Sequence, residues 1–342
     1  ATTNALQSYF NDIFFHNPWS DDDLHSLVYE TEDGKITGFL GIIPRRMSLR
    51  GRPIRVALSM HFMVEPGRRS SLAGVQLLKA LLSGPQDLAL TDGAGEVGRK
   101  VWEGLGGSAA PVYGLNWTRV LQPSQYALHL VGQQQAGHRP WLSSLLNAFQ
   151  PVGRIADALA SRFLPRHFHL SATSLTEEEL TNDKLLECIN RFSANDALRP
   201  EYDEHSLPWL LKNAERLGQR SKLQSVLLRN GAGEIVGWFL YYLNPAGLSD
   251  VLQVAARRGA TSEVLDHLFH HAQRLGAWAI TGRLEPKLMP ELTDKHCYLR
   301  CNGPWVLVHS REPDLLHVIN QGQAFLSRLE GDWCLRFQGK TN

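Results

Sequence analysis

The spacing of apolar residues over the first 65 positions predicts one helix followed by a set of strands. Residues 4–15 carry apolar side chains at helical spacing. The next segments alternate between apolar and polar side chains, and turns rich in Gly and Pro separate them. The predicted strands are 26–29, 36–43 and 55–64, and they form an antiparallel meander. The last of them places Leu58, Met60, Phe62 and Val64 on one face.

The period of the pattern changes after residue 64. Leu72, Val75, Leu78 and Leu82 recur at helical spacing, and the Ser-Gly-Pro sequence at 83–85 ends that helix. The pattern then predicts a strand at 87–90, a helix at 97–105 and further strand at 112–121. Strands that alternate with helices in this way are typical of an α/β fold.

Residues 133–166 carry a different pattern, in which three prolines interrupt two apolar helical stretches. This pattern predicts a helical linker. The first pattern recurs after it, with helices at 178–192 and 207–217, a hairpin at 225–243, a strand at 250–255 and a helix at 264–275. The sequence Gly-Lys-Ile-Thr-Gly at 34–38 corresponds to Gly-Glu-Ile-Val-Gly at 233–237.

The recurrence predicts two tandem domains, each a mixed, mostly antiparallel sheet flanked by helices. The expected boundaries are an N-terminal domain at 1–132, a helical linker at 133–168 and a C-terminal domain at 169–342. Each domain is long enough to bury a core of its own.

The composition is that of an ordinary globular protein. The 342 residues are 43% hydrophobic and 20% charged, and the formal net charge is +1. This charge argues against a nucleic-acid partner, and no apolar run is long enough to span a membrane. The four cysteines form no CxxC pair, so we expect reduced thiols in a soluble cytoplasmic protein without a metal. The oligomeric state is left open.

One loop stands out as a site for an anion. A strand ends at Val64, a loop of small residues with two arginines follows, and a helix begins near Gly74. Backbone N–H groups at the start of a helix are unpaired and bind phosphate groups. Small side chains let a ligand approach this backbone closely.

The same stretch resembles the signature of the GNAT superfamily of acyl-CoA N-acyltransferases. The sequence Arg-Ser-Ser-Leu-Ala-Gly at 69–74 stands at the place of the R-x-x-G-x-G/A motif, with Leu72 replacing the first glycine. Residues 94–107 resemble the family's second helix, with Trp102 where many members carry tyrosine. The resemblance implies an acetyl-CoA or other acyl-CoA co-substrate, bound by Met63, Val64, Arg68, Arg69, Ser70, Ser71, Leu72, Ala73 and Gly74.

The resemblance also implies the reaction: an amine of a small molecule, an amino sugar or a protein attacks the thioester. His61 is the first candidate for the base, because its ordinary pKa suits proton transfer, and Glu65 at the strand end is the second. Asp92 either positions the amine or caps a helix, and Tyr113 is the candidate acid in place of the missing tyrosine. The other interpretation of His61 is a hydrogen bond within the sheet, and that of Glu65 is a solvated acid.

The second half matches the family more weakly. Its loop at 256–261 is shorter and has Thr261 at the position of the second glycine, so we expect a degenerate domain. Two alternatives remain open: a CoA-binding or protein-interaction scaffold without activity, and a peptidyl-type transferase that takes aminoacyl-tRNA. His267 and His271 lie one helical turn apart, and we expect them on the solvent face of a helix instead of at a zinc ion.

Overall fold

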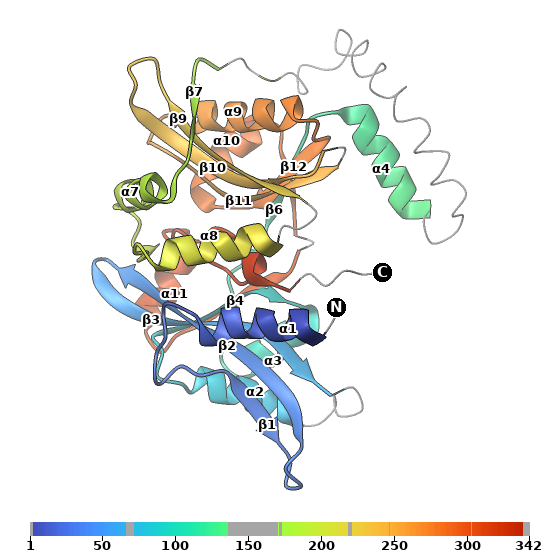
Figure 1. Cartoon of the computed structure of the whole chain (residues 1–342), viewed down its shortest axis with the longest axis vertical. Helices are drawn as coiled ribbons and strands as arrows, with labels where there is room; N and C mark the ends of the chain where they lie inside the picture. Colours follow the sequence, from blue (N-terminus) through green and yellow to red (C-terminus); the bar gives the residue numbers. More distant parts are fainter. Residues whose placement is uncertain are drawn as a thin grey trace.

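The computed structural model of the chain contains two mixed β-sheets, one above the other, with helices around and between them (Figure 1). This arrangement confirms the predicted α/β class with two sheets that are each flanked by helices. The structure describes residues 3–65, 72–135, 170, 173–217, 221–245, 247–301 and 303–337.

The first sheet has the strand order β1-β2-β3-β4-β14-β5, and the short strand β8 pairs with one end of β2. Strands β1, β2 and β3 form the predicted antiparallel meander, and β4 lies parallel to β3 after the helix α2. The strands are β1 (Leu27–Glu30), β2 (Ile36–Leu49), β3 (Arg52–Val64), β4 (Leu88–Ala94), β5 (Ser108–Ala109), β8 (Leu198–Pro200) and β14 (Trp305–His309).

Strand β3 contains a β-bulge that its alternating pattern does not reveal. The register with β2 shifts there, so that two residues of β3, His61 and Phe62, lie opposite one residue of β2, Leu40. Up to Met60 the alternation follows the prediction. Beyond the bulge, Phe62 and Val64 face the start of α2, so the prediction that they share the face of Met60 is wrong. One inserted residue turns every later side chain to the other face.

The second sheet repeats this plan with the order β13-β6-β12-β11-β10-β9-β7. Strands β9, β10 and β11 are antiparallel, and β12 lies parallel to β11 after the helix α9. The strands are β6 (Asn116–Val120), β7 (Thr176–Glu179), β9 (Lys222–Arg229), β10 (Ile235–Leu243), β11 (Leu248–Ala256), β12 (Ala279–Arg283) and β13 (Tyr298–Arg300), and α9 is Thr261–Arg274.

The two glycine-rich repeats occupy equivalent turns in the two sheets. Gly34 lies in the turn from β1 to β2, and Gly233 lies in the turn from β9 to β10. Their φ angles are +79° and +78°, a left-handed conformation that glycine adopts without steric cost. The short repeat in the sequence thus marks the same hairpin in each half.

Each sheet contains a strand from the other half of the chain, so the division between the sheets does not follow the predicted boundary at 133–168. Strand β6 comes from the first half of the chain and pairs with β12 in the second sheet. Strand β14 comes from the second half and pairs with β4 in the first sheet. A core of buried side chains from both halves lies between the sheets. Each sheet therefore depends on the other half of the chain to be complete.

Helices cover the outer faces of the sheets and fill the space between them. Helices α2 and α3 enclose a core against the first sheet, whereas α1 and α8 lie between the two sheets (Figure 1). The helical elements are α1 (Thr3–Phe10), the π-helix η1 (Asn11–Phe15), α2 (Ala73–Leu82), α3 (Glu96–Gly104), α4 (Pro123–Gln135), α7 (Asn182–Phe192), α8 (Ser206–Leu217), η3 (Pro286–Leu288), α10 (Met289–Asp294), α11 (Pro313–Asn320) and η4 (Trp333–Leu335).

Two expectations about the middle of the chain have different outcomes. Most of the predicted linker at 133–168 lies outside the described residues. The helix predicted to begin at 178 begins at Asn182, because 176–179 pairs with β9 as the edge strand β7. Within the described ranges, no helix is long and apolar enough to cross a membrane.

Candidate functional site

Strands β3 and β4 part soon after they pair, and a cavity occupies the gap. Their pairing covers only Val56–Leu58 on β3 and Leu88–Leu90 on β4, although both strands continue beyond it. The cavity in this gap has a volume of about 300 Å³. Its walls come from β2, β3, β4, α2, α3, β14 and the C-terminal segment: Leu40, Ser59, Met60, His61, Phe62, Leu78, Thr91, Gly93, Ala94, Gly95, Gly98, Trp102, Leu307, Asp332 and Arg336.

A second hollow of about 760 Å³ adjoins the first and shares Phe62 with it. It follows the outer end of β3 toward the start of α2 and has mostly apolar walls: Ile36, Thr37, Gly38, Phe39, Phe62, Met63, Val64, Glu65, Gly74, Val75, Val97 and Val101. We refer to the inner space as the cavity and to this outer space as the groove. The groove lies at the start of α2 and the cavity lies in the gap between β3 and β4, with Phe62 lining both.

The predicted cofactor-binding residues that can be placed lie along the groove or next to it. Met63, Val64 and Gly74 line it. Leu72 is exposed at the N-cap of α2, and Ala73 is the buried first residue of that helix. Four further candidates fall outside the described residues: Arg68, Arg69, Ser70 and Ser71.

Gly74 packs closely against β3 at the start of α2. A Cβ atom added there would lie 3.0 Å from the Phe62 ring and 3.5 Å from Val64. The bulge in β3 turns the side chains of Phe62 and Val64 toward α2, where Gly74 leaves room for them. A larger residue at position 74 would push into the groove.

His61 is the bulge residue of β3, and its φ of +51° is unusual for a non-glycine residue. The Tyr9 hydroxyl donates to the carbonyl oxygen of Leu335 (2.6 Å), so it accepts from the Nε2–H of His61 (2.5 Å). This pairing leaves His61 Nδ1 unprotonated. Burial, together with the positive charge of Arg336, lowers the pKa of His61 to about 4. His61 is therefore neutral at physiological pH, with Nδ1 unprotonated, and the lowered pKa makes it a weaker base than an ordinary imidazole.

Aromatic rings surround the His61 imidazole on the side of α1. The rings of Tyr9, Phe10 and Phe14 lie 5.5, 6.2 and 6.3 Å from it, measured between centroids. Phe39 packs against Phe10 and Phe14 in turn. This packing fixes the orientation of the imidazole and explains why its charged form is disfavoured.

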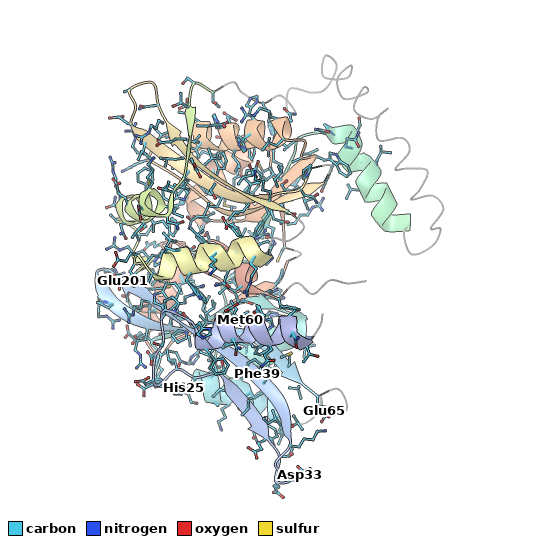
Figure 2. All side chains as sticks on the ribbon, in the orientation of Figure 1. His25, Asp33, Phe39, Met60, Glu65 and Glu201 are labelled. Atoms are coloured by element: carbon cyan, nitrogen blue, oxygen red, sulfur yellow. The ribbon has the colours of Figure 1, made fainter. Side chains whose placement is uncertain are left out.

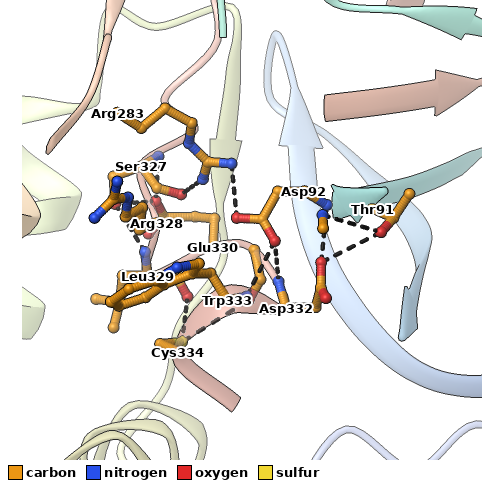
Figure 3. Close-up of polar contacts among 12 residues, drawn as sticks. Thr91, Asp92, Arg283, Ser327, Arg328, Leu329, Glu330, Asp332, Trp333 and Cys334 are labelled. Carbon is orange, nitrogen blue, oxygen red and sulfur yellow. Dashed lines mark hydrogen bonds and ion pairs between the residues drawn. The ribbon is translucent and has the colours of Figure 1, made fainter. Parts of the chain in front are cut away.

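Asp92 is buried at the end of β4 and does not line the cavity. Its Oδ1 accepts from the backbone N–H groups of Asp332 (2.8 Å) and Trp333 (3.0 Å), and its Oδ2 pairs with Arg283 (2.7 Å) (Figure 3). The Arg283 guanidinium lowers the pKa of Asp92 against the opposing effect of burial. Asp92 thus connects the first sheet to the C-terminal turn η4 and to β12, and it caps no helix of its own half.

Asp332 lines the cavity, whereas Asp92 does not. It accepts from the Asp92 N–H (2.8 Å) and from two nitrogens of Arg336 (2.9 Å each). Burial and the Asp92 carboxylate raise the pKa of Asp332. The Arg336 guanidinium covers Gly93, where an added Cβ would lie 1.0 Å from its Nη2 atom. The C-terminal segment therefore closes the inner side of the cavity with Asp332 and Arg336.

The remaining two catalytic candidates lie away from His61. Glu65 lies at the outer end of β3 (Figure 2). It lines the groove and pairs with Lys35 (2.6 Å). The Tyr113 hydroxyl donates to the Ala324 carbonyl oxygen (2.8 Å) and accepts from the Ala324 N–H (3.1 Å). Burial raises the pKa of Tyr113. Of the four candidates, His61 alone lines the cavity.

Three residues at or beside the cavity have no counterpart in the sequence prediction: Tyr9, Asp332 and Arg336. Tyr9 lies in the predicted first helix, and its only signal is a polar group among apolar neighbours. Asp332 is 240 residues from Asp92 along the chain. No local pattern reports a contact of that separation.

The corresponding gap in the second sheet is filled by the chain itself. Strands β11 and β12 pair over Leu248–Val251 and Ala279–Gly282. Beyond that point the N–H of Arg328 donates to Leu252 (3.1 Å), and the Arg283 guanidinium donates to the carbonyl of Ser327. Buried Gln253 donates to Glu330 (3.1 Å) and Ser327 (3.3 Å). The segment 327–330 thus lies where a ligand would have to enter.

His267 and His271 are buried, so the prediction of a solvent-facing pair is wrong. Glu177 of the edge strand β7 covers them: its Oε1 lies 2.9 Å from His267 Nε2, and Arg274 pairs with it as well. His271 Nδ1 pairs with the Tyr241 hydroxyl (2.8 Å). In the described part of the chain, no group of three His, Cys, Asp or Glu residues could hold a metal ion.

The comparisons with known proteins concern the fold. No protein-family model and no curated protein sequence matches the chain. A GCN5-related N-acetyltransferase from Anabaena variabilis is similar in structure, with a TM-score of 0.58, 13% identity and coverage of 91% of this chain and 67% of that one. A probable N-acyltransferase from Enterococcus faecalis has a TM-score of 0.53, 11% identity and coverage of 90% and 65%.

The N-myristoyltransferase of Saccharomyces cerevisiae, solved with myristoyl-CoA and inhibitors, is similar as well. Its TM-score is 0.51, its identity 14%, and the match covers 90% of this chain and 78% of that one. The chain thus spans about two thirds of the length of the first two structures and about four fifths of the third. Together with the two repeated sheets, these matches show that the chain has the fold of the GNAT superfamily of N-acyltransferases.

Proposed function

We propose that this protein is an N-acyltransferase that transfers an acyl group from acyl-CoA to a primary amine. The acceptor belongs to one of three classes: a small molecule, an amino sugar or a protein. One observation carries the proposal: β3 and β4 part to form a cavity lined by a neutral histidine, and a groove that shares Phe62 with this cavity lies at the start of α2. The GNAT fold supports the same class of reaction.

The groove and the cavity fit the parts of an acyl-CoA. The pantetheine arm is long and carries amide groups, and the backbone of β3 beyond Leu58 pairs with β2 but not with β4. That edge offers N–H and C=O groups to the arm, as an exposed strand edge does to an added strand. The N-terminus of α2 lies at the outer end, where its dipole favours the phosphates.

The His61 imidazole is placed to serve as the base. Its Nδ1 accepts a proton as the amine nitrogen forms its bond to the thioester carbon. The carbon–sulfur bond then breaks and the CoA thiolate leaves. Tyr113 is held by Ala324, so we assign the proton for the thiolate to the protonated His61 or to solvent. Tyr9 keeps Nδ1 free by accepting the Nε2–H, which makes it a positioning residue.

Binding without turnover is the second candidate. Asp92 and Tyr113 are both engaged in buried hydrogen bonds, which leaves His61 as the only catalytic candidate in the cavity. A protein that binds CoA as a sensor or scaffold would have this property. Release of free CoA in the presence of a panel of amines separates the two candidates.

The binding step is tested by calorimetric titration with coenzyme A and acetyl-CoA. We expect one site per chain, and we expect Gly74→Glu to weaken binding at least 100-fold because it fills the groove with a negative charge. Thr261→Glu at the equivalent helix start in the second half is the matched control and leaves the affinity unchanged. If the wild-type chain binds neither compound, the proposal is overturned.

A further inference from the structure

The cavity in the first sheet has one apolar wall that the transfer of an acetyl group does not need. Four side chains form it, one each from β2, α2, α3 and β14: Leu40, Leu78, Trp102 and Leu307. Their exposed fractions are 1, 4, 1 and 1%. They belong to the core between the first sheet and its outer helices. The cavity therefore extends through the gap into that core.

The titratable and charged groups of the cavity come from other segments than this wall. His61 contacts α1, and Asp332 and Arg336 come from the C-terminal segment. The Trp102 indole N–H, which would be the one polar atom of the apolar wall, donates to the carbonyl oxygen of Val308 (3.0 Å). Two hydroxyl groups also line the cavity, and both have partners: Ser59 donates to the carbonyl oxygen of Leu90 (3.5 Å), and Thr91 bonds to Asp332 (3.3 Å) and to the Gly93 N–H (3.4 Å).

The volume is larger than a two-carbon group occupies. A buried apolar cavity of about 150 Å³ holds a benzene molecule. The cavity here, at about 300 Å³, is twice that size, and the thioester beside His61 takes part of this volume. Closely packed cores do not keep such voids without cause, since each one weakens the packing around it.

We infer that the acyl group of this enzyme is longer than acetyl, a linear chain of about six to eight carbons that lies against Leu40, Leu78, Trp102 and Leu307. The inference rests on the proposed function, because the thioester must be held beside His61 for its chain to reach this wall. Each methylene that leaves water raises the affinity about fourfold. The chain length of the acyl group therefore governs the affinity.

The test is a calorimetric series with coenzyme A, acetyl-CoA, hexanoyl-CoA and octanoyl-CoA on the full chain. We expect hexanoyl-CoA to bind at least tenfold more tightly than acetyl-CoA. Equal affinities for all three acyl-CoAs, with coenzyme A itself bound, would overturn the inference and leave the proposed function standing. Failure to bind coenzyme A and every acyl-CoA would overturn both.

Two adjacent leucines of α2 provide a matched pair of variants. Leu78 lines the cavity and Leu77 does not, although both are 4% exposed. Leu78→Phe fills the space, so we expect it to abolish the preference for hexanoyl-CoA without changing the affinity for coenzyme A. Leu77→Phe keeps the preference. A Leu78→Phe variant that binds coenzyme A normally and still prefers hexanoyl-CoA tenfold would overturn the assignment of this wall.

Discussion

The two sheets repeat one plan, yet the gap between their parallel strands is open in the first and filled in the second. In the first sheet, β3 carries a bulge at His61, and small residues at Gly93, Gly95 and Gly98 line the opposite side of the gap. In the second sheet, the segment 327–330 lies along β11, and the Arg328 N–H bonds to the free edge of that strand at Leu252. A duplicated fold thus has its candidate site where the chain leaves the gap open, which agrees with the rule that fold alone does not give function.

The same C-terminal segment has two roles in this difference. Its first part fills the second gap, and its later part, Asp332 and Arg336, forms a wall of the first cavity. Arg283 bonds to Ser327 in the filling segment and to Asp92 on β4. The segment that fills the gap in the second sheet therefore also supports the open gap in the first sheet. Substitutions at the two gaps distinguish these roles, and the largest effect is expected at Asp92.

Asp92→Asn breaks the connection between the two gaps. We expect it to lower the free energy of unfolding by about 3–5 kcal/mol, because it leaves the buried guanidinium of Arg283 without its counter-ion. Urea unfolding measures this change. Asp314→Asn, which removes an exposed pair with Arg50, is the control and should cost less than about 1 kcal/mol. A similar small loss for Asp92→Asn would contradict the proposed connection.

His61→Gln tests the chemistry of the open gap. We expect kcat to fall about 100-fold or more, with an unchanged affinity for coenzyme A, because glutamine cannot accept the proton. Tyr9→Phe should lower kcat less, by about tenfold, since the imidazole remains but its tautomer is no longer fixed. Wild-type kcat in the His61→Gln variant would contradict the assignment of His61 as the base.

The low pKa of His61 predicts a loss of stability in acid. In the folded protein this pKa is about 4, against 6.5 for the ordinary group, so the unfolded chain binds the proton first as the pH falls. The contribution is present above pH 6.5 and is lost between pH 6.5 and 4, by about 3 kcal/mol. Urea unfolding of the His61→Gln variant between pH 6.5 and 4 should show a loss of unfolding free energy that is smaller than the loss in the wild type by that amount. The control His205→Gln, at an exposed histidine, should behave as wild type.

The smallest effect is expected at Glu65. Its side chain is 39% exposed and pairs with exposed Lys35. Glu65→Gln should change the free energy of unfolding by less than about 1 kcal/mol and kcat by less than about threefold. A fall in kcat as large as that of His61→Gln would make Glu65 the base and place the chemistry in the groove.

The sequence predicts most of the individual strands and helices around the first gap. The apolar period identifies β3, α2, β4 and α3, and the small residues near Gly74 mark the start of α2. These features are visible because each depends on neighbours a few positions away. The repeat of Gly34 at Gly233 reveals the duplication for the same reason.

The parts that decide the site depend on distant segments. The bulge at His61 is set by pairing with β2, which the alternation of β3 cannot report. The exchange of β6 and β14 between the sheets leaves no trace in either strand's own pattern. The sequence around Asp92 is compatible with a helix-capping residue and with a catalytic residue. Only its contacts with Arg283 and Asp332 show that it connects the first sheet to the second half of the chain.

The most direct test of the central claim is a crystal structure of the protein with bound coenzyme A. The account predicts the pantetheine arm between β3 and β4, with the thiol beside His61, and the segment 327–330 still in place between β11 and β12. Coenzyme A between β11 and β12, with the first gap vacant, would contradict it.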